Sequence, residues 1–170
     1  MKYRSTVMSC VLGTAMVVLA ATAAPLSTSA APGAKGHSHA PDGQTAYGKP
    51  GNPKKKSRLI EITMKDGDGK MWFEPKAISV KRGEQILFKL SNIGALDHEI
   101  VIATLKENLE HAKEMEKNPD MEHDDPNAKR LKPNAQGEIF WHFTKVGKFD
   151  MSCLIPGHRE AGMTGTITVK

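Results

Sequence analysis

Near its C-terminal end the chain reads CLIPGHREAGM, from Cys153 to Met163. This stretch places a thiol, the imidazole of His158 and a thioether at five-residue intervals. Together with a second histidine, such side chains form the ligand set of a mononuclear copper site, with two His and one Cys in a trigonal plane and a weak axial Met. His98, which follows a glycine-containing turn and begins an apolar segment, is the candidate for that histidine. Soft sulfur ligands beside imidazoles favour copper, so the sequence predicts one copper site.

The first 30 residues have the features of a signal peptide. Lys2 and Arg4 precede an apolar run from Val7 to Ala24, and small residues follow. A membrane anchor is the weaker interpretation, because the uninterrupted run is shorter than about 20 residues. Cys10 precedes most of that run, which disfavours a lipoprotein. We therefore expect removal of residues 1–30, export to the bacterial periplasm, and a mature chain without a membrane span.

Export would place Cys153 in an oxidising compartment. The chain has two cysteines, and removal of the signal peptide, which holds Cys10, leaves only Cys153. A lone thiol in an oxidising compartment cannot form an internal disulfide and is open to oxidation. Metal ligation gives this thiol a function, and a buried inert cysteine does not explain the His and Met spaced after it.

Charge and length limit the classes of function. The formal net charge of +5 falls by two when Lys2 and Arg4 are removed. A balance this mild, without a clustered basic face, argues against a nucleic-acid partner. Residues 31–57 are rich in Pro, Gly, Ala, Lys and Ser, which predicts a flexible tail or linker. Residues 58–170 then form one domain with a real core.

Within residues 58–170, short β-branched and apolar segments alternate with turn signals such as DGDG at residues 66–69. The predicted strands cover residues 59–64, 71–73, 77–80, 85–90, 98–102, 138–143, 148–152 and 165–169. Such a series of short strands predicts an all-β protein with an antiparallel β-sandwich.

One segment has helical periodicity instead. Leu105 to Lys117 contains no Gly or Pro, and Leu105, Leu109 and Ala112 fall on one face, which predicts a short surface helix inserted in the sandwich. Residues 121–133, which follow the helix, are polar and are predicted to form a loop.

Several segments resemble the cupredoxins, a family of copper proteins. They are FEPKAISVKRGE at residues 73–84, HEI at residues 98–100, and the stretch of residues 153–163. PGH at residues 156–158 and AGMTG at residues 161–165, with the helical insertion, resemble the periplasmic CopI-like copper-tolerance cupredoxins. The resemblance extends over residues 58–170.

The resemblance implies a Greek-key β-sandwich or barrel with one type 1 copper at its end. Its ligands carry over to His98, Cys153, His158 and Met163. The resemblance leaves the physiological role open between two alternatives, which are copper tolerance, as in the CopI-like group, and electron transfer, as in most other cupredoxins.

The function predicted from these features is one-electron Cu(I)/Cu(II) chemistry in the service of copper tolerance or homeostasis. The alternative is a soluble electron carrier for a respiratory or reductase partner. Such a partner would dock near His158, where an apolar collar is predicted from Leu154, Ile155, Pro156 and Ala161.

An enzyme is not expected. Copper oxidases and nitrite reductases need His-x-His pairs for further copper centres and more than one cupredoxin domain, whereas the single His-x-His pair here, His37 and His39, lies in the predicted tail. Zinc hydrolysis is disfavoured because Met is a poor zinc ligand.

Weaker extra copper sites are one interpretation of the remaining His and Met residues. The candidates are His37, His39, His111, Met115, Met121 and His123. His111 and Met115 lie one helical turn apart on the same face. The alternative is a solvated helix that packs Met115 against the core, and His142, between two aromatic residues, is interpreted as structural.

Overall fold

The computed structural model describes residues 44–119 and 125–170. The predicted signal peptide, His37, His39, Met121 and His123 lie outside the described residues. Within the described residues, no helix is long and apolar enough to cross a membrane. The elements are β1 (Lys49–Pro50), β2 (Arg58–Gly67), β3 (Lys70–Glu74), β4 (Ala77–Val80), β5 (Gln85–Asn92), β6 (His98–Ala103), α1 (Leu105–Lys117), β7 (Ala128–Leu131), β8 (Gln136–His142), β9 (Gly147–Ser152) and β10 (Thr164–Val169).

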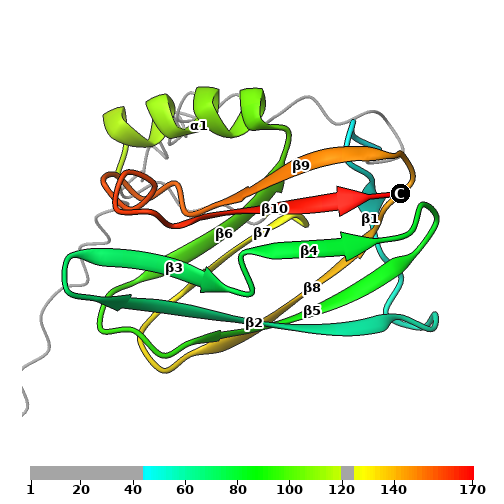
Figure 1. The fold of residues 1–170 in the computed structure, drawn as a ribbon, viewed down its shortest axis with the longest axis horizontal. Helices are drawn as coiled ribbons and strands as arrows, with labels where there is room; N and C mark the ends of the chain where they lie inside the picture. Colours follow the sequence, from blue (N-terminus) through cyan, green and yellow to red (C-terminus); the bar gives the residue numbers. More distant parts are fainter. Residues whose placement is uncertain (1–43, 120–124) are drawn as a thin grey trace, which may run out of the picture. The chain divides into compact units, whose positions relative to one another are not determined.

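The strands form two five-stranded sheets, in the orders β1-β8-β5-β2-β3 and β4-β10-β9-β6-β7 (Figure 1). The prediction of an all-β sandwich with a short helical insertion is confirmed. The expectation of purely antiparallel pairing was wrong, because β2 pairs with β5 and β4 pairs with β10 in parallel. The chain leaves the first sheet after β3 and returns to it at β5, so strands that are distant in sequence come to lie side by side. Hydrophobic patterning does not reveal strand direction.

The core lies between the sheets and is built by alternation of side chains along each strand. In β5, Ile86, Phe88 and Leu90 are fully buried, while the residues between them are more exposed. In contrast, all six residues of β6 are buried. Strand β6 contacts α1 as well as its neighbours in the sheet, so both faces of this strand are covered.

The alternation along β6 assigns its residues to two faces. Ile100 and Ile102 belong to the main core, while Val101 belongs to a second cluster with Met115 of α1. Because side chains point to opposite faces with a period of two, His98 shares the face of Ile100, and Glu99 shares that of Val101.

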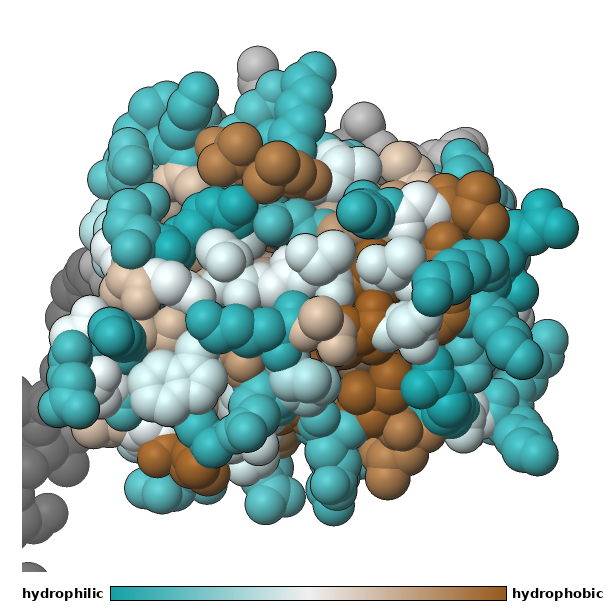
Figure 2. Space-filling model, viewed as in Figure 1, coloured by the Kyte–Doolittle hydropathy of each residue, from teal (hydrophilic) through white to brown (hydrophobic). Residues whose placement is uncertain are grey.

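Helix α1 has the predicted bounds but buries a different face. Leu105 and Leu109, which share the apolar face noted in the sequence, are 52% and 44% exposed, and Figure 2 shows hydrophobic surface over this helix. Asn108, His111 and Met115 are buried instead. The reason is a polar contact that periodicity cannot reveal, since Asn108 Nδ2 donates to the Asp150 carboxylate and to the carbonyl oxygen of Val101. The helix begins with a capping box between Thr104 and Glu107.

Two segments expected to be irregular contain strands in their described parts. Strand β7 lies within residues 121–133 and pairs antiparallel with β6, placing Leu131 opposite His98. Residues 44–57, the end of the predicted flexible tail, contain β1 and the buried Tyr47. The Tyr47 ring stacks on Trp141 with centroids 5.5 Å apart, and Trp141 Nε1 donates to the Tyr47 carbonyl oxygen at 3.1 Å. Tyr47 and the pairing of β1 with β8 thus join this segment to the sandwich, so the packed part of the chain includes residues before the predicted boundary at residue 58.

Candidate metal centre

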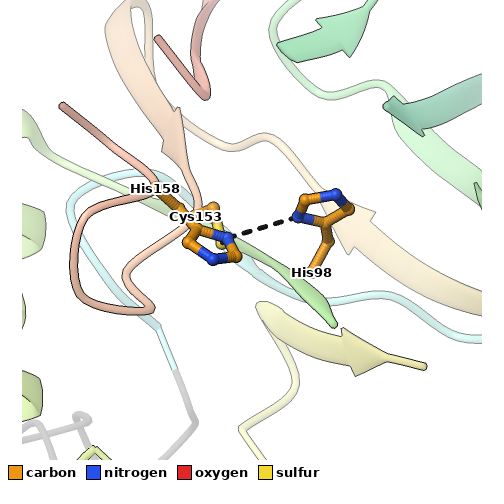
Figure 3. Close-up of side chains that lie close together, drawn as sticks. All are labelled: His98, Cys153 and His158. Carbon is orange, nitrogen blue, oxygen red and sulfur yellow. Dashed lines mark hydrogen bonds between the residues drawn. The ribbon is translucent and has the colours of Figure 1, made fainter. Parts of the chain in front are cut away.

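Three predicted ligands come together at one end of the sandwich (Figure 3). His98 is the first residue of β6, Cys153 directly follows β9, and His158 lies in the loop from β9 to β10. His98 Nδ1 lies 3.3 Å from His158 Nδ1, which lies 3.4 Å from Cys153 Sγ. The three donor atoms all lie within 4.8 Å of one another. His98 and Cys153 are fully buried, and His158 is 9% exposed.

Strand pairing positions these residues. Strand β6 pairs antiparallel with β9, so the start of β6 lies beside the end of β9. As a result, the Glu99 amide donates to Cys153 Sγ at 3.3 Å. This hydrogen bond joins the thiol to the strand that carries His98.

The loop from Cys153 to Met163 is closed by its own backbone. The Cys153 amide donates to the Met163 carbonyl oxygen at 3.1 Å, and the Met163 amide donates to the His158 carbonyl oxygen at 3.0 Å. Gly157 and Gly162 have φ angles of +86° and +103°, which side chains with a Cβ rarely adopt. These two glycines therefore permit the tight turns of the loop.

Met163, the predicted axial ligand, is fully buried in the same core cluster as Cys153. The backbone hydrogen bond between the two residues keeps the start of β10 next to Cys153. The assignment of the Met163 thioether to the metal stays a prediction.

Burial keeps the Cys153 thiol and the His158 imidazole uncharged in the metal-free protein. Burial raises the pKa of the Cys153 thiol to about 12, although the Glu99 and Ile155 amides favour the thiolate. A metal ion must therefore displace the thiol proton. Burial, and then the nearby charge of His98, lower the pKa of His158, which keeps its imidazole neutral as metal ligation requires. Two imidazoles and one thiol, all withdrawn from water, match the equatorial donors of a type 1 copper site.

A residue that the sequence analysis did not identify also contacts the site. Asp66 Oδ1 lies 2.8 Å from His98 Nε2. Burial alone would raise the pKa of Asp66, but hydrogen bonds with the His98 ring and with the Ala95 and Leu96 amides outweigh it and hold that pKa below its usual value. In the sequence, Asp66 belongs to the turn signal DGDG, and nothing local relates it to His98.

The other candidate ligands are placed differently. Met115 packs in an apolar cluster with Val101, Ala128 and Leu154, the structural role that was the alternative for this residue. His111, on the same helix, is 5% exposed. His142 Nε2 lies 3.0 Å from the carbonyl oxygen of Gly83. In the part of the chain that the structure describes, His98, Cys153 and His158 form the one group of three or more His, Cys, Asp or Glu residues that could hold a metal ion.

The predicted collar around His158 is only partly at the surface. Leu154 is buried and belongs to the cluster beneath α1. Ile155 and Ala161 are half-buried, and Pro156 is exposed. Ile93 and Leu96, in the segment before His98, are 59% and 45% exposed.

Known proteins match both the sequence and the fold. The model of the copper-binding proteins of the plastocyanin/azurin family matches residues 60–170. The copper-resistant cuproprotein CopI of Rubrivivax gelatinosus is 46% identical over 132 residues, which cover 78% of each chain. CopI of Pseudomonas aeruginosa PAO1 is 34% identical over 154 residues, covering 74% of this chain and 83% of the relative.

Solved structures of auracyanins share the architecture. Reduced auracyanin from Roseiflexus castenholzii gives a TM-score of 0.56 at 25% identity, covering 67% of this chain and 98% of that protein. Auracyanin B gives a TM-score of 0.58 at 20% identity, covering 73% and 96%. With the buried His98, Cys153 and His158 cluster at the end of a β-sandwich, these matches show that the chain belongs to the plastocyanin/azurin family of copper-binding proteins.

Proposed function

We propose that this protein is a periplasmic type 1 copper protein that serves copper tolerance through one-electron Cu(I)/Cu(II) chemistry. The observation that carries the proposal is the buried cluster of two imidazoles and one thiol. The relatives named copper-resistant cuproproteins, one of them 46% identical, support the physiological role. The apolar run and basic start of residues 1–30 support export to the periplasm.

The residues around the site suit a metal that changes oxidation state without moving its ligands. His98 and Cys153 are held by two paired strands, and His158 by the hydrogen-bonded loop. When bound there, copper supplies a one-electron couple between Cu(I) and Cu(II). Complete burial of His98 and Cys153 excludes water, and the Glu99 amide directed at Cys153 Sγ stabilises negative charge on the sulfur.

We also propose that the protein is not an enzyme. Both His98 and Cys153 are fully buried, and His158 is 9% exposed. A substrate molecule therefore has no room to reach the metal, whereas an electron can pass through the edge of the His158 ring.

Electron carriage is the second candidate function, and one observation favours it. Exposed Pro156 and half-buried Ile155 and Ala161 lie within three residues of His158 on the same loop and add apolar atoms to it. A redox partner with a complementary apolar patch could dock there and exchange an electron through His158.

Gene deletion separates the two roles. For a tolerance protein, deletion lowers growth in excess copper and leaves respiratory growth intact; a carrier gives the opposite result. Complementation with wild type and with Cys153→Ser tests whether the predicted copper site is responsible, and fractionation of the cells tests the periplasmic location. A deletion strain that grows normally in both conditions would contradict both roles.

A further inference from the structure

Asp66 occupies an unexpected position at the metal end of the sandwich. Strand β2 extends into the predicted turn as far as Gly67, so Asp66 lies in the ladder opposite Met71 of β3. The hairpin of β2 and β3 and the loop from β9 to β10 lie at the same end of the molecule (Figure 1). The Asp66 side chain is only 13% exposed.

The carboxylate of Asp66 is directed at the segment that carries the ligand His98. Its Oδ1 lies 2.8 Å from His98 Nε2 and accepts from the Leu96 amide at 3.3 Å. Its Oδ2 accepts from the Ala95 amide at 3.2 Å. Three N–H groups from four consecutive residues thus converge on one carboxylate that belongs to a different strand.

This contact determines which nitrogen of His98 faces the metal site. A carboxylate only accepts hydrogen bonds, so His98 Nε2 must carry the proton that it shares with Asp66. In the neutral imidazole, Nδ1 then keeps its lone pair. Nδ1 is the atom that points toward His158 and Cys153 (Figure 3).

Gly94 makes the approach of Asp66 possible. A Cβ at position 94 would lie 1.9 Å from Asp66 Oδ1 and 2.9 Å from His98 Nε2. Any residue other than glycine would therefore force the carboxylate and the imidazole apart. Gly94, which has no side chain, thus leaves space for the hydrogen bond between Asp66 and His98.

We propose that Asp66 is a positioning residue of the metal centre, which fixes His98 Nδ1 as the metal-binding atom and makes it a stronger donor. The inference rests on the proposed copper site. A hydrogen bond from the distal ring nitrogen to a carboxylate raises the basicity of the ligating nitrogen. A stronger donor and a nearby negative charge stabilise Cu(II) more than Cu(I), so Asp66 lowers the reduction potential.

The test compares Asp66→Asn with Asp68→Asn. Both variants remove one negative charge from the same hairpin, but Asp68 is exposed, and its φ angle of 50° is one that asparagine readily adopts. The measurements are the affinity for Cu(II), the affinity for Cu(I), the reduction potential, and the free energy of unfolding of the metal-free protein.

For Asp66→Asn we expect the Cu(II) affinity to fall about 10- to 100-fold, as for other hydrogen-bond partners of metal ligands. The Cu(I) affinity falls less, so the reduction potential rises. Asp68→Asn matches the wild type in all four measurements. Equal losses of Cu(I) and Cu(II) affinity with an unchanged potential would show that Asp66 only supports the loop, and would overturn the proposal.

A measurement on the metal-free wild type keeps the inference testable if Asp66→Asn does not fold. ¹⁵N spectroscopy of the His98 ring in its neutral form should show the proton on Nε2 and none on Nδ1. The reverse tautomer would overturn the proposal. A wild-type protein that binds no coloured copper would instead refute the proposed function, which distinguishes the two failures.

Discussion

Cys153 is the residue on which we expect the visible spectrum of the copper-loaded protein to depend. Its Sγ is the sole thiol within the described residues, is fully buried, and accepts a hydrogen bond from the Glu99 amide. Charge transfer from a thiolate to Cu(II) gives intense visible absorption. We expect Cys153→Ser to abolish the colour, because a serine hydroxyl does not give this charge-transfer absorption. Visible spectroscopy of the copper-loaded variant tests the prediction. Visible bands that persist in the variant would show that the thiol is not a ligand.

Met163 allows a test of the axial position. The side chain is fully buried, and leucine has nearly the same volume, so Met163→Leu should cost less than about 1.5 kcal/mol of stability. We expect this variant to retain copper and its charge-transfer band. The reduction potential should rise, because loss of a weak donor destabilises Cu(II) more than Cu(I). Voltammetry measures this shift, and complete loss of copper would instead make Met163 a structural anchor of the loop.

At the scale of elements, one polar network joins the ligand loop, β9 and α1. Arg159, next to His158, donates from Nη1 to Asp150 Oδ2 at 2.9 Å and also contacts the Ser152 hydroxyl. Asn108 of α1 donates to the same carboxylate oxygen at 2.8 Å. The Arg159 and Asp150 side chains are 16% and 11% exposed, so the ion pair is largely withdrawn from water.

Removal of the Arg159 guanidinium from this network should lower the stability of the folded protein. We expect Arg159→Met to lower the free energy of unfolding by about 3 kcal/mol, because the Asp150 carboxylate stays buried without its partner. The control is Lys106→Met, which breaks the Lys106–Glu110 pair on the exposed side of α1, where the charges are 3.9 Å apart. We expect no measurable change in the control. Chemical denaturation measures both, and equal effects would contradict the network.

At the scale of the whole molecule, Tyr47 links the segment before β2 to the sandwich. Burial, and then the charge of Glu107, raise the pKa of Tyr47 to about 12 from its usual 10. The neutral phenol is therefore favoured in the folded protein. Its contribution to stability is fully present below pH 10, the unfolded value, and is lost as the pH rises through about 12.

Tyr47→Phe tests this linkage. The variant keeps the ring on Trp141 and the backbone bond to Trp141 Nε1 but has no proton to lose. Between pH 10 and 12, the wild type should lose about 2 kcal/mol more stability than the variant. Denaturation of both proteins across this range measures the difference, and parallel curves would contradict the prediction.

The hypothesis of weaker extra copper sites also concerns the whole chain. His37 and His39, with Met121 and His123, are expected to bind further copper ions weakly, so titration should exceed one equivalent at high copper. Deletion of residues 31–43 and replacement of Met121 and His123 should lower copper tolerance and leave the coloured site intact. Residues 44–57 must be kept, because Tyr47 packs in the core. A titration that stops at one equivalent would refute the hypothesis.

Local sequence patterns predicted most helices and strands, because these elements depend on residue alternation and capping within each segment. Strand segments such as β4 and β5 alternate apolar and polar residues, and α1 runs uninterrupted between a capping threonine and the segment before Pro119. Strand β7 carries little apolar signal and was missed, because its order comes from pairing with β6. The buried face of α1 could not be read from its apolar residues for a similar reason, since Asp150, far along the chain, accepts a hydrogen bond from Asn108.

The predicted metal centre likewise combines residues that local patterns predicted and residues that only the structure revealed. Cys153, His158 and Met163 lie on one loop, so their spacing alone predicted them as ligands, and His98 was predicted as a histidine at the start of a strand. Asp66 and Gly94 acquire their roles only when β2 is brought beside the segment before β6. The sequence by itself determined the fold class and the ligand chemistry, because spacing and side-chain type express both. Only the tertiary structure decided which nitrogen of His98 faces the site, because that depends on a hydrogen bond between residues 32 positions apart.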